Sequence, residues 1–216
     1  MFHSSKLVPH RLNFVTSCFI FCFLLMLSTA GYASERIASF SIGPVWPKDL
    51  LNSGRPTSWN AEGIYGIIVD RTVAFGLTSN FLWNTQSKEE KIPATGRDSV
   101  IESHEYYMYP ISGFIMFDPL YKRVIHPTFR LEIGYNSLKY YERESDVTAI
   151  DHPDGYYFGL YTKLAIDGTY DIGKHSSFFV GGSYQWADTR TTESNHTYSR
   201  IDMSGLGLQL GFRFLL

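Results

Sequence analysis

The stretch that decides the fold is GLGLQLGFRFLL, residues 205–216. Its even-numbered positions are all leucine or phenylalanine, and its odd-numbered positions up to 213 are glycine, glutamine or arginine. Successive side chains of a β-strand point to opposite faces, so this alternation predicts a strand with one strongly apolar face and one small or polar face. A helix does not fit, because its apolar residues would recur every three or four positions.

The same alternation recurs upstream, clearly in four segments and more weakly in three. The resulting strands are about 10–14 residues long, which suits tilted transmembrane strands (about 9–11 residues) better than the strands of ordinary globular domains (about 5–6). In two segments, 60–69 and 104–117, the facing stays open because both parities carry apolar residues. The sequence therefore predicts eight strands, near residues 36–46, 60–69, 73–83, 104–117, 129–136, 158–167, 178–186 and 206–216.

The connections between these segments alternate between short and long. Short turns are expected at Asp70-Arg71, across Asp118 to Ile125 and near Gly168 to Ser176. The other connections are longer and more polar. This asymmetry is typical of outer-membrane barrels, whose short turns face the periplasm and whose long loops face outward. With an even number of strands, both ends of the barrel are expected on the short-turn side. The expected long loops are Pro47 to Trp59, Asn84 to Ser103, Glu142 to Asp154, and Asp188 to Ser199.

The polar faces of the strands are rich in glycine, which suits the narrow interior of an eight-stranded barrel. Buried charges need partners, so we expect their charged residues to form an ion-pair network that fills the lumen, in preference to a conducting pore. Lipid leaves no backbone polar group unpaired, so the sheet is expected to close. The expected lumen residues are Arg130, Glu132, Lys163, Asp167, Gln185, Gln209 and Arg213.

The apolar faces carry aromatic residues at both ends of several strands. Tryptophans fall at the long-loop ends and phenylalanines nearer the short-turn ends. Aromatic girdles of this kind flank the lipid-facing band of membrane barrels. The predicted girdle residues are Trp46, Trp83 and Trp186 at one end, and Phe75, Phe129, Phe178 and Phe214 at the other.

As a pattern, the chain resembles the small eight-stranded outer-membrane proteins, the group that includes the outer-membrane protein A transmembrane domain and the opacity-type adhesins. The most specific part is the C-terminal strand, which looks like the signal read by the barrel assembly machinery. The family usually ends in phenylalanine, whereas here Phe214 is followed by two leucines. The resemblance implies an all-β, closed, antiparallel up-and-down barrel that contacts outer-membrane lipid and lipopolysaccharide. The signal residues it implies are Gly211, Phe212, Phe214 and Leu216.

The N-terminus predicts export. Lys6 and Arg11 precede a mostly apolar run over residues 14–27, and small residues at Gly31 and Ala33 predict cleavage after Ala33. The domains are then a cleaved signal peptide, 1–33, and a barrel, 34–216, in a bacterial outer membrane. Cleavage removes two cations and no acid, which moves the net charge from −2 to −4, and it removes both cysteines.

Neither the composition nor the motifs indicate a catalytic, metal-binding or nucleic-acid-binding site. The net charge of −2 suggests no nucleic-acid partner. The five histidines beyond the signal peptide show no metal-ligand spacing, so no metal or other cofactor is expected. One triplet, His175-Ser176-Ser177, matches the letters of a motif used by lipid A deacylases, but it falls at an expected periplasmic turn, away from the outer leaflet.

The function expected from the sequence is that of a structural or surface-interaction barrel without catalysis. Its loops could bind an extracellular ligand, because a rigid scaffold often presents binding residues on loops. The alternative is a small channel for ions or apolar solutes. A second alternative is a lipid A-modifying enzyme.

Overall fold

The computed structural model describes residues 35–48, 57–91, 98–144, 155–191 and 200–216. The chain divides into two units, Met1–Ser34 and Glu35–Leu216. The expected signal peptide lies outside the described residues. In the described part of the chain, no helix has the length and hydropathy needed to cross a membrane.

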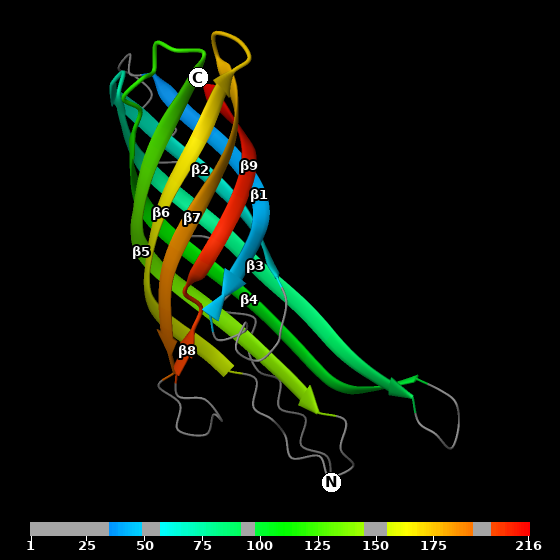
Figure 1. The fold of residues 1–216 in the computed structure, drawn as a ribbon. Coiled ribbons are helices and arrows are strands. Elements are labelled where there is room, and N and C mark those ends of the chain that lie inside the picture. Colours follow the sequence, from blue (N-terminus) through cyan, green and yellow to red (C-terminus); the bar gives the residue numbers. More distant parts are fainter. Residues whose placement is uncertain (1–34, 49–56, 92–97, 145–154, 192–199) are drawn as a thin grey trace. The chain divides into compact units, whose positions relative to one another are not determined.

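The second unit is a closed antiparallel barrel (Figure 1). The eight barrel strands pair in chain order, and the barrel closes where the first, β1 (Arg36–Pro47), pairs with the end of the last, β9 (Gly205–Leu215). The predicted fold class and the count of eight barrel strands are confirmed. The strands are β1 (Arg36–Pro47), β2 (Ser58–Asp70), β3 (Val73–Lys91), β4 (Asp98–Phe117), β5 (Ile125–Glu144), β6 (Gly155–Asp171), β7 (Ser176–Arg190), β8 (Arg200–Asp202) and β9 (Gly205–Leu215).

The short β8 is the beginning of the eighth barrel strand. It pairs with β7 in the same register as β9, since Asp188 faces Asp202 and Gln185 faces Gly205. The interruption at Met203 is local, because the Ser204 hydroxyl accepts a 3.0 Å hydrogen bond from the Ala187 amide where a ladder bond would lie. The last strand therefore starts earlier than its alternation indicated.

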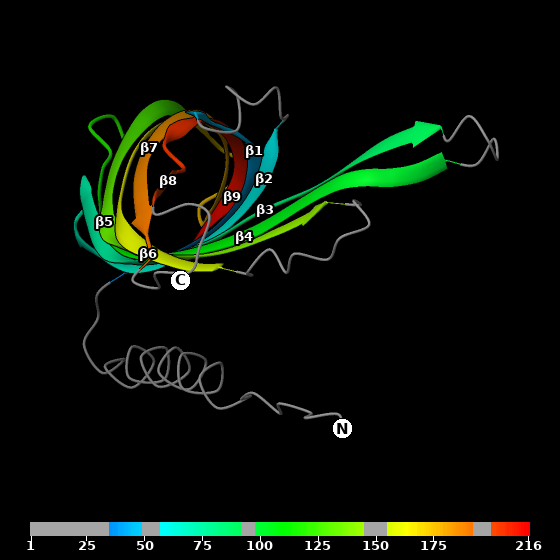
Figure 2. The same cartoon turned by 90° about the horizontal axis from the view of Figure 1, so that it is seen from below.

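Five strands are longer than the sequence predicted: β3 has 19 residues, β4 and β5 have 20 each, β6 has 17 and β7 has 15. The long loop expected from Asn84 to Ser103 is wrong, because β3 continues to Lys91 and β4 already begins at Asp98. The two strands pair with each other all the way to these residues. Figure 2 shows this ribbon leaving the ring of the barrel.

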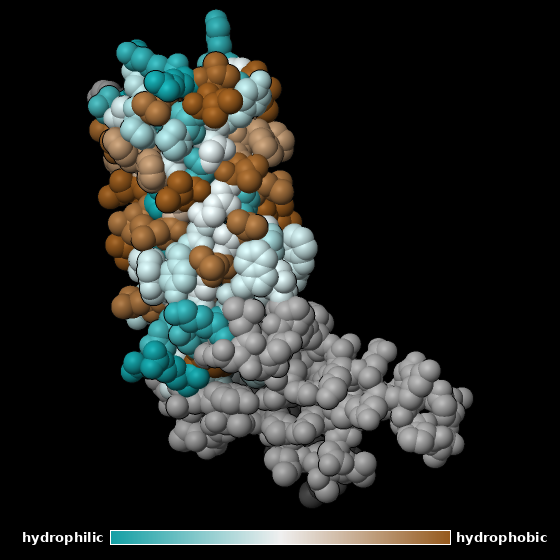
Figure 3. All heavy atoms as spheres, in the orientation of Figure 1, coloured by the Kyte–Doolittle hydropathy of each residue, from teal (hydrophilic) through white to brown (hydrophobic). Residues whose placement is uncertain are grey.

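The outward-facing surface is predominantly apolar. Large hydrophobic side chains are exposed along its strands, including Ile133 at 60% and Leu160 at 68%. Figure 3 shows brown, hydrophobic side chains along the height of one face, with hydrophilic ones gathered at the upper, short-turn end and again at the lower end of the coloured surface. An exposed apolar surface this extensive is unusual for a soluble monomer and typical of a membrane-facing one.

The interior is layered. At the loop end, buried apolar side chains such as Leu82, Met108 and Tyr161 pack together. Near the turn end, Ile64, Phe114 and Met116 form a second apolar cluster. Polar and charged side chains fill the space between and beside them.

This layering explains the two segments whose facing the sequence left open. Even-numbered residues of β2 and β4 point inward, including Ile64 and Phe114, while large apolar residues such as Tyr65 and Ile115 face out. Because both faces are apolar in these two strands, alternation alone could not distinguish them.

The seam between β1 and β9 requires a small residue at Gly43. A Cβ there would overlap the backbone carbonyl oxygen of Leu208 on the neighbouring strand. Gly43→Ala is therefore expected to lower the free energy of unfolding by about 1–3 kcal/mol, the usual range for overpacking. Denaturant unfolding in lipid vesicles measures this change. Gly63→Ala is the matched control, since a Cβ at Gly63 enters open space; an equal loss in both variants would contradict close approach as the cause.

Candidate functional site

The most unusual group of side chains is an ionic network across the middle of the lumen. Its centre is Glu62 on β2, which reaches across the barrel to two cations on the opposite wall. Its Oε1 lies 2.5 Å from Nη2 of Arg130 on β5, and its Oε2 accepts a hydrogen bond from Nζ of Lys163 on β6. One carboxylate therefore ties β2 to strands that are not its neighbours in the sheet.

A second carboxylate completes the network. Oε1 of Glu132 lies 2.9 Å from Nε of Arg130 and 3.7 Å from Nζ of Lys163. Its Oε2 accepts hydrogen bonds from the neighbouring wall, at 3.4 Å from Thr78 and 3.3 Å from Ser112. Two carboxylates thus balance two cations.

The exposed fraction of each of the four side chains is 2% or less. They lie on three different strands, β2, β5 and β6, so they meet inside the barrel and fill it. Charges taken out of water are stable only when paired and hydrogen-bonded. The network therefore makes the middle of the lumen a packed, ionic core.

A second polar cluster lies toward the turn end, on the wall formed by β6, β7 and β9. Asp167 accepts a 2.6 Å hydrogen bond from Nε2 of Gln209 and lies 3.8 Å from Nη2 of Arg213. The Arg213 guanidinium also lies over the ring of Phe179, at 5.2 Å from its centroid. A cation stacked on an aromatic face keeps favourable electrostatics without water.

A third polar group lies at the turn end of the barrel. His126 is buried, with Nδ1 at 2.7 Å from Asp118 and Nε2 at 3.5 Å from Asp171. Asp118 begins the β4–β5 turn and Asp171 ends β6, so the imidazole joins two neighbouring turns.

The structure buries all seven residues that the sequence assigned to the lumen. It brings six of them into the two ionic clusters. Gln185 lies apart, near the loop end, where its side chain donates a 2.9 Å hydrogen bond to the carbonyl of Met203.

Sequence reasoning missed Glu62, the centre of the network. The signal that could have found it is charge balance. The expected lumen set held three cations (Arg130, Lys163 and Arg213) but only two carboxylates (Glu132 and Asp167), so one buried cation lacked a counter-ion. Glu62 is the carboxylate that supplies it.

All the predicted girdle residues lie on outward-facing positions. Trp186, Phe75, Phe129 and Phe214 are exposed, and Trp46, Trp83 and Phe178 are partly exposed. Trp83 stands beside Trp59, which sequence reasoning did not assign, and stacks on Phe81 at 5.1 Å. Trp59 was missed because the sequence placed it at the end of the expected loop from Pro47, whereas β2 already begins at Ser58.

The residues of the predicted assembly signal line the closing seam. Phe212 and Phe214 point outward, whereas Gly211 faces inward close to the carbonyl oxygen of Phe40. The amide of Leu216 donates a 2.9 Å hydrogen bond to the carbonyl of Arg36 at the start of β1. Their role in assembly stays a prediction.

The triplet from His175 to Ser177 lies at the β6–β7 turn. The His175 side chain is exposed, and Ser177 points into the barrel wall and is buried. Among the described residues, no group of three His, Cys, Asp or Glu side chains is arranged to hold a metal ion. The charged stretch 88–91 falls in β3, and its side chains lie outside the described ones.

Comparison with known proteins identifies the fold. The sequence matches no protein-family model and no curated protein. Among solved structures, the chain is similar to Neisserial surface protein A, with a TM-score of 0.55 and 10% identity over 84% of this chain and 96% of that one. It is similar to a major outer membrane protein from Thermus thermophilus, with a TM-score of 0.50 and 10% identity over 86% of this chain and all of that one. The predicted resemblance to small outer-membrane barrels is confirmed at the level of the fold.

Proposed function

We propose that this chain is an integral outer-membrane β-barrel with a structural or surface-interaction role. Its short turns face the periplasm and its long loops face outward. The observation that carries the proposal is the polarity of the wall: the outside exposes aliphatic and aromatic side chains, and the inside buries ion pairs. A soluble barrel has the opposite arrangement, because water favours polar groups on the outside.

A role as a conduit is disfavoured by the packed lumen. The charged side chains that would line a pore are bonded to one another and are at most 5% exposed. We expect planar bilayers loaded with the folded chain to stay electrically silent. Discrete conductance steps from the wild type, altered by Lys163→Met, would overturn this assignment in favour of a channel.

The orientation predicts which end of the barrel a reagent reaches from outside the cell. Arg190 lies at the loop end of β7 and Lys174 in the β6–β7 turn, and both are exposed. A membrane-impermeant maleimide should label Arg190→Cys on intact cells, and Lys174→Cys only after the outer membrane is permeabilised. Both native cysteines fall within the predicted signal peptide, so the cleaved chain adds no background. Labelling of Lys174→Cys alone on intact cells would reverse the orientation.

The loop-end margin supports contact with lipopolysaccharide. Two outward lysines lie near aromatic rings there: Lys48 is 5.5 Å from the ring centroid of Tyr184 and Lys139 is 5.3 Å from that of Tyr156. Ammonium groups at this level suit the phosphates of lipid A, and the rings suit the water–lipid boundary. The barrel assembly machinery is the partner proposed for the C-terminal strand, and any extracellular ligand would bind the loops.

A further inference from the structure

The β4–β5 turn, residues 118–124, is held in one conformation although it is the longest of the three turns at its end of the barrel. The amide of Asp118 donates to the carbonyl of Thr72 at 2.7 Å, and the amide of Arg123 donates to that of Leu120 at 2.8 Å. The carbonyl of Val124 accepts a 2.9 Å bond from Asp171. The turn is therefore ordered before any ligand arrives, which lowers the entropic cost of binding.

Its one carboxylate is turned away from its cations. Asp118 pairs with the buried His126 at 2.7 Å, so it points toward the lumen. Lys122 and Arg123 follow each other at the exposed tip of the turn, and neither forms an ion pair with a described residue. Two adjacent positive charges thus remain uncompensated within the turn.

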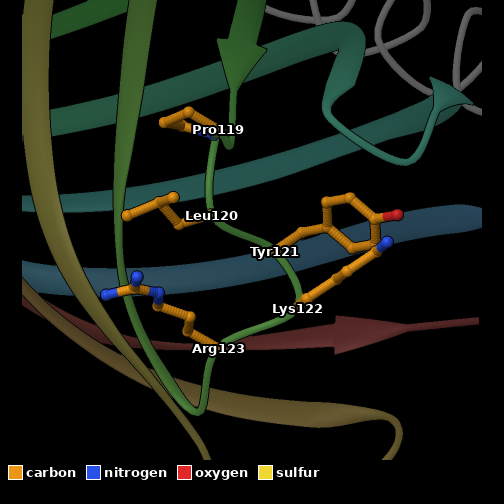
Figure 4. A pocket seen from close by; sticks show the side chains of 5 residues that line it. All are labelled: Pro119, Leu120, Tyr121, Lys122 and Arg123. Carbon is orange, nitrogen blue, oxygen red and sulfur yellow. The ribbon is translucent and has the colours of Figure 1, made fainter.

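The turn encloses a small pocket lined by residues 119–123. Figure 4 shows Tyr121 and Lys122 side by side on one flank, with the amino group next to the ring, and Leu120 and Arg123 on the other flank. The ammonium lies 5.7 Å from the Tyr121 ring centroid. An ammonium and a phenol are both hydrogen-bond donors, and a guanidinium suits phosphate oxygens. Each flank therefore presents a cation beside an apolar or aromatic group.

The position of the turn favours a phosphate carried by a lipid over a free phosphate. Exposed apolar residues lie where the turn joins the strands: Phe117, the last residue of β4, is 47% exposed, Val124, the last of the turn, 59%, and Ile125, the first of β5, 70%. The cations lie directly beyond this apolar edge, at the level where lipid headgroups would lie. A phosphate attached to acyl chains would satisfy both features, whereas a free anion would use only the charge.

We propose that the β4–β5 turn is a binding site for anionic phospholipid headgroups of the leaflet on the short-turn side. Lys122 with Tyr121 holds a phosphate on one flank, and Arg123 beside Leu120 holds one on the other. This inference rests on the membrane orientation proposed above. It assigns to that leaflet a lipid contact distinct from lipopolysaccharide, at the opposite end of the barrel.

The test is a titration of the folded chain in neutral detergent, followed by the amide NMR shifts of residues 118 and 120–124. The probes are dihexanoyl phosphatidylglycerol, dihexanoyl phosphatidylcholine and inorganic phosphate. The phosphatidylglycerol should give saturable shifts, and Lys122→Gln with Arg123→Gln should weaken binding by about fivefold for each cation removed. A matched double variant at other turns, Arg71→Gln with Lys174→Gln, should leave the affinity nearly unchanged.

Three results would overturn the site. Equal binding of phosphatidylcholine would remove the requirement for negative charge. Equal binding of inorganic phosphate would make it a free-anion site. An equal loss of affinity in the Arg71→Gln with Lys174→Gln variant would show that binding depends on the net charge of the protein and not on this turn. A failure of the barrel assignment is separate, because it would appear as a sample without heat-dependent migration before any lipid is added.

Discussion

Glu62→Gln is expected to lower the free energy of unfolding by about 3–5 kcal/mol, the cost of removing one partner from a buried ion pair. The amide keeps the size of the side chain but removes its charge. Arg130 and Lys163 would then share Glu132 alone, and the lumen would hold an uncompensated cation. Denaturant unfolding in lipid vesicles, followed by tryptophan fluorescence, measures the change.

The control for Glu62 is Glu35→Gln, which removes an exposed carboxylate at the turn end and should change stability by no more than about 0.5 kcal/mol. A second variant tests the cause. Adding Lys163→Met to Glu62→Gln removes the cation that has lost its partner. The double variant should therefore recover part of the lost unfolding free energy, since the effects of substitutions at residues in contact are not additive. Equal stability of Glu62→Gln and Glu35→Gln would contradict a buried network.

Ile133→Arg is expected to cost about 2–4 kcal/mol, because a charge on the lipid face near the bilayer midplane must be desolvated. Ile133 lies in the middle of β5, paired with Gly113 and Thr162, and is 60% exposed. On the surface of a soluble barrel the same substitution would change stability by only about 0.5 kcal/mol. Unfolding in vesicles again provides the measurement.

The matched control for Ile133 is Val69→Arg. Val69 is as exposed, at 65%, but it is the penultimate residue of β2 and lies at the turn end. Near the interface an arginine should cost only about 0–1 kcal/mol. The difference between the stability losses of the two variants, rather than either value alone, shows that Ile133 lies deeper in the bilayer than Val69. Equal costs at both would contradict a membrane-facing wall.

The fold could be predicted because barrels of this kind follow a strict sequence pattern. Each spanning strand must present one apolar face, and the alternation in residues 205–216 states this directly. The same rule failed for β2 and β4, where Ile64 and Phe114 pack inside the lumen and make both faces apolar. It also failed beyond the barrel rim, where β3 and β4 continue as a ribbon.

The candidate site could be predicted only in part, for a related reason. Arg130, Glu132 and Lys163 were identified because they lie on the polar parity of strands whose opposite parity is clearly apolar. Glu62 shares its face with Ile64, so its inward direction depended on the closed geometry of the barrel. The contact between Glu62 and Lys163 joins residues 101 positions apart, and no local pattern carries that information. The turn from Asp118 to Ile125 was predicted, but no sequence pattern marked its Lys122 and Arg123 as binding residues.

The most direct test of the central claim, a closed barrel inserted in the outer membrane, is the migration of the protein on a detergent gel with and without boiling. The sample is the outer-membrane fraction of cells that express the chain. A closed membrane barrel resists mild detergent, so we predict recovery in that fraction and a change of migration on heating. A soluble periplasmic protein whose migration does not depend on heat would contradict the claim, and the apolar face would then have to be the interior.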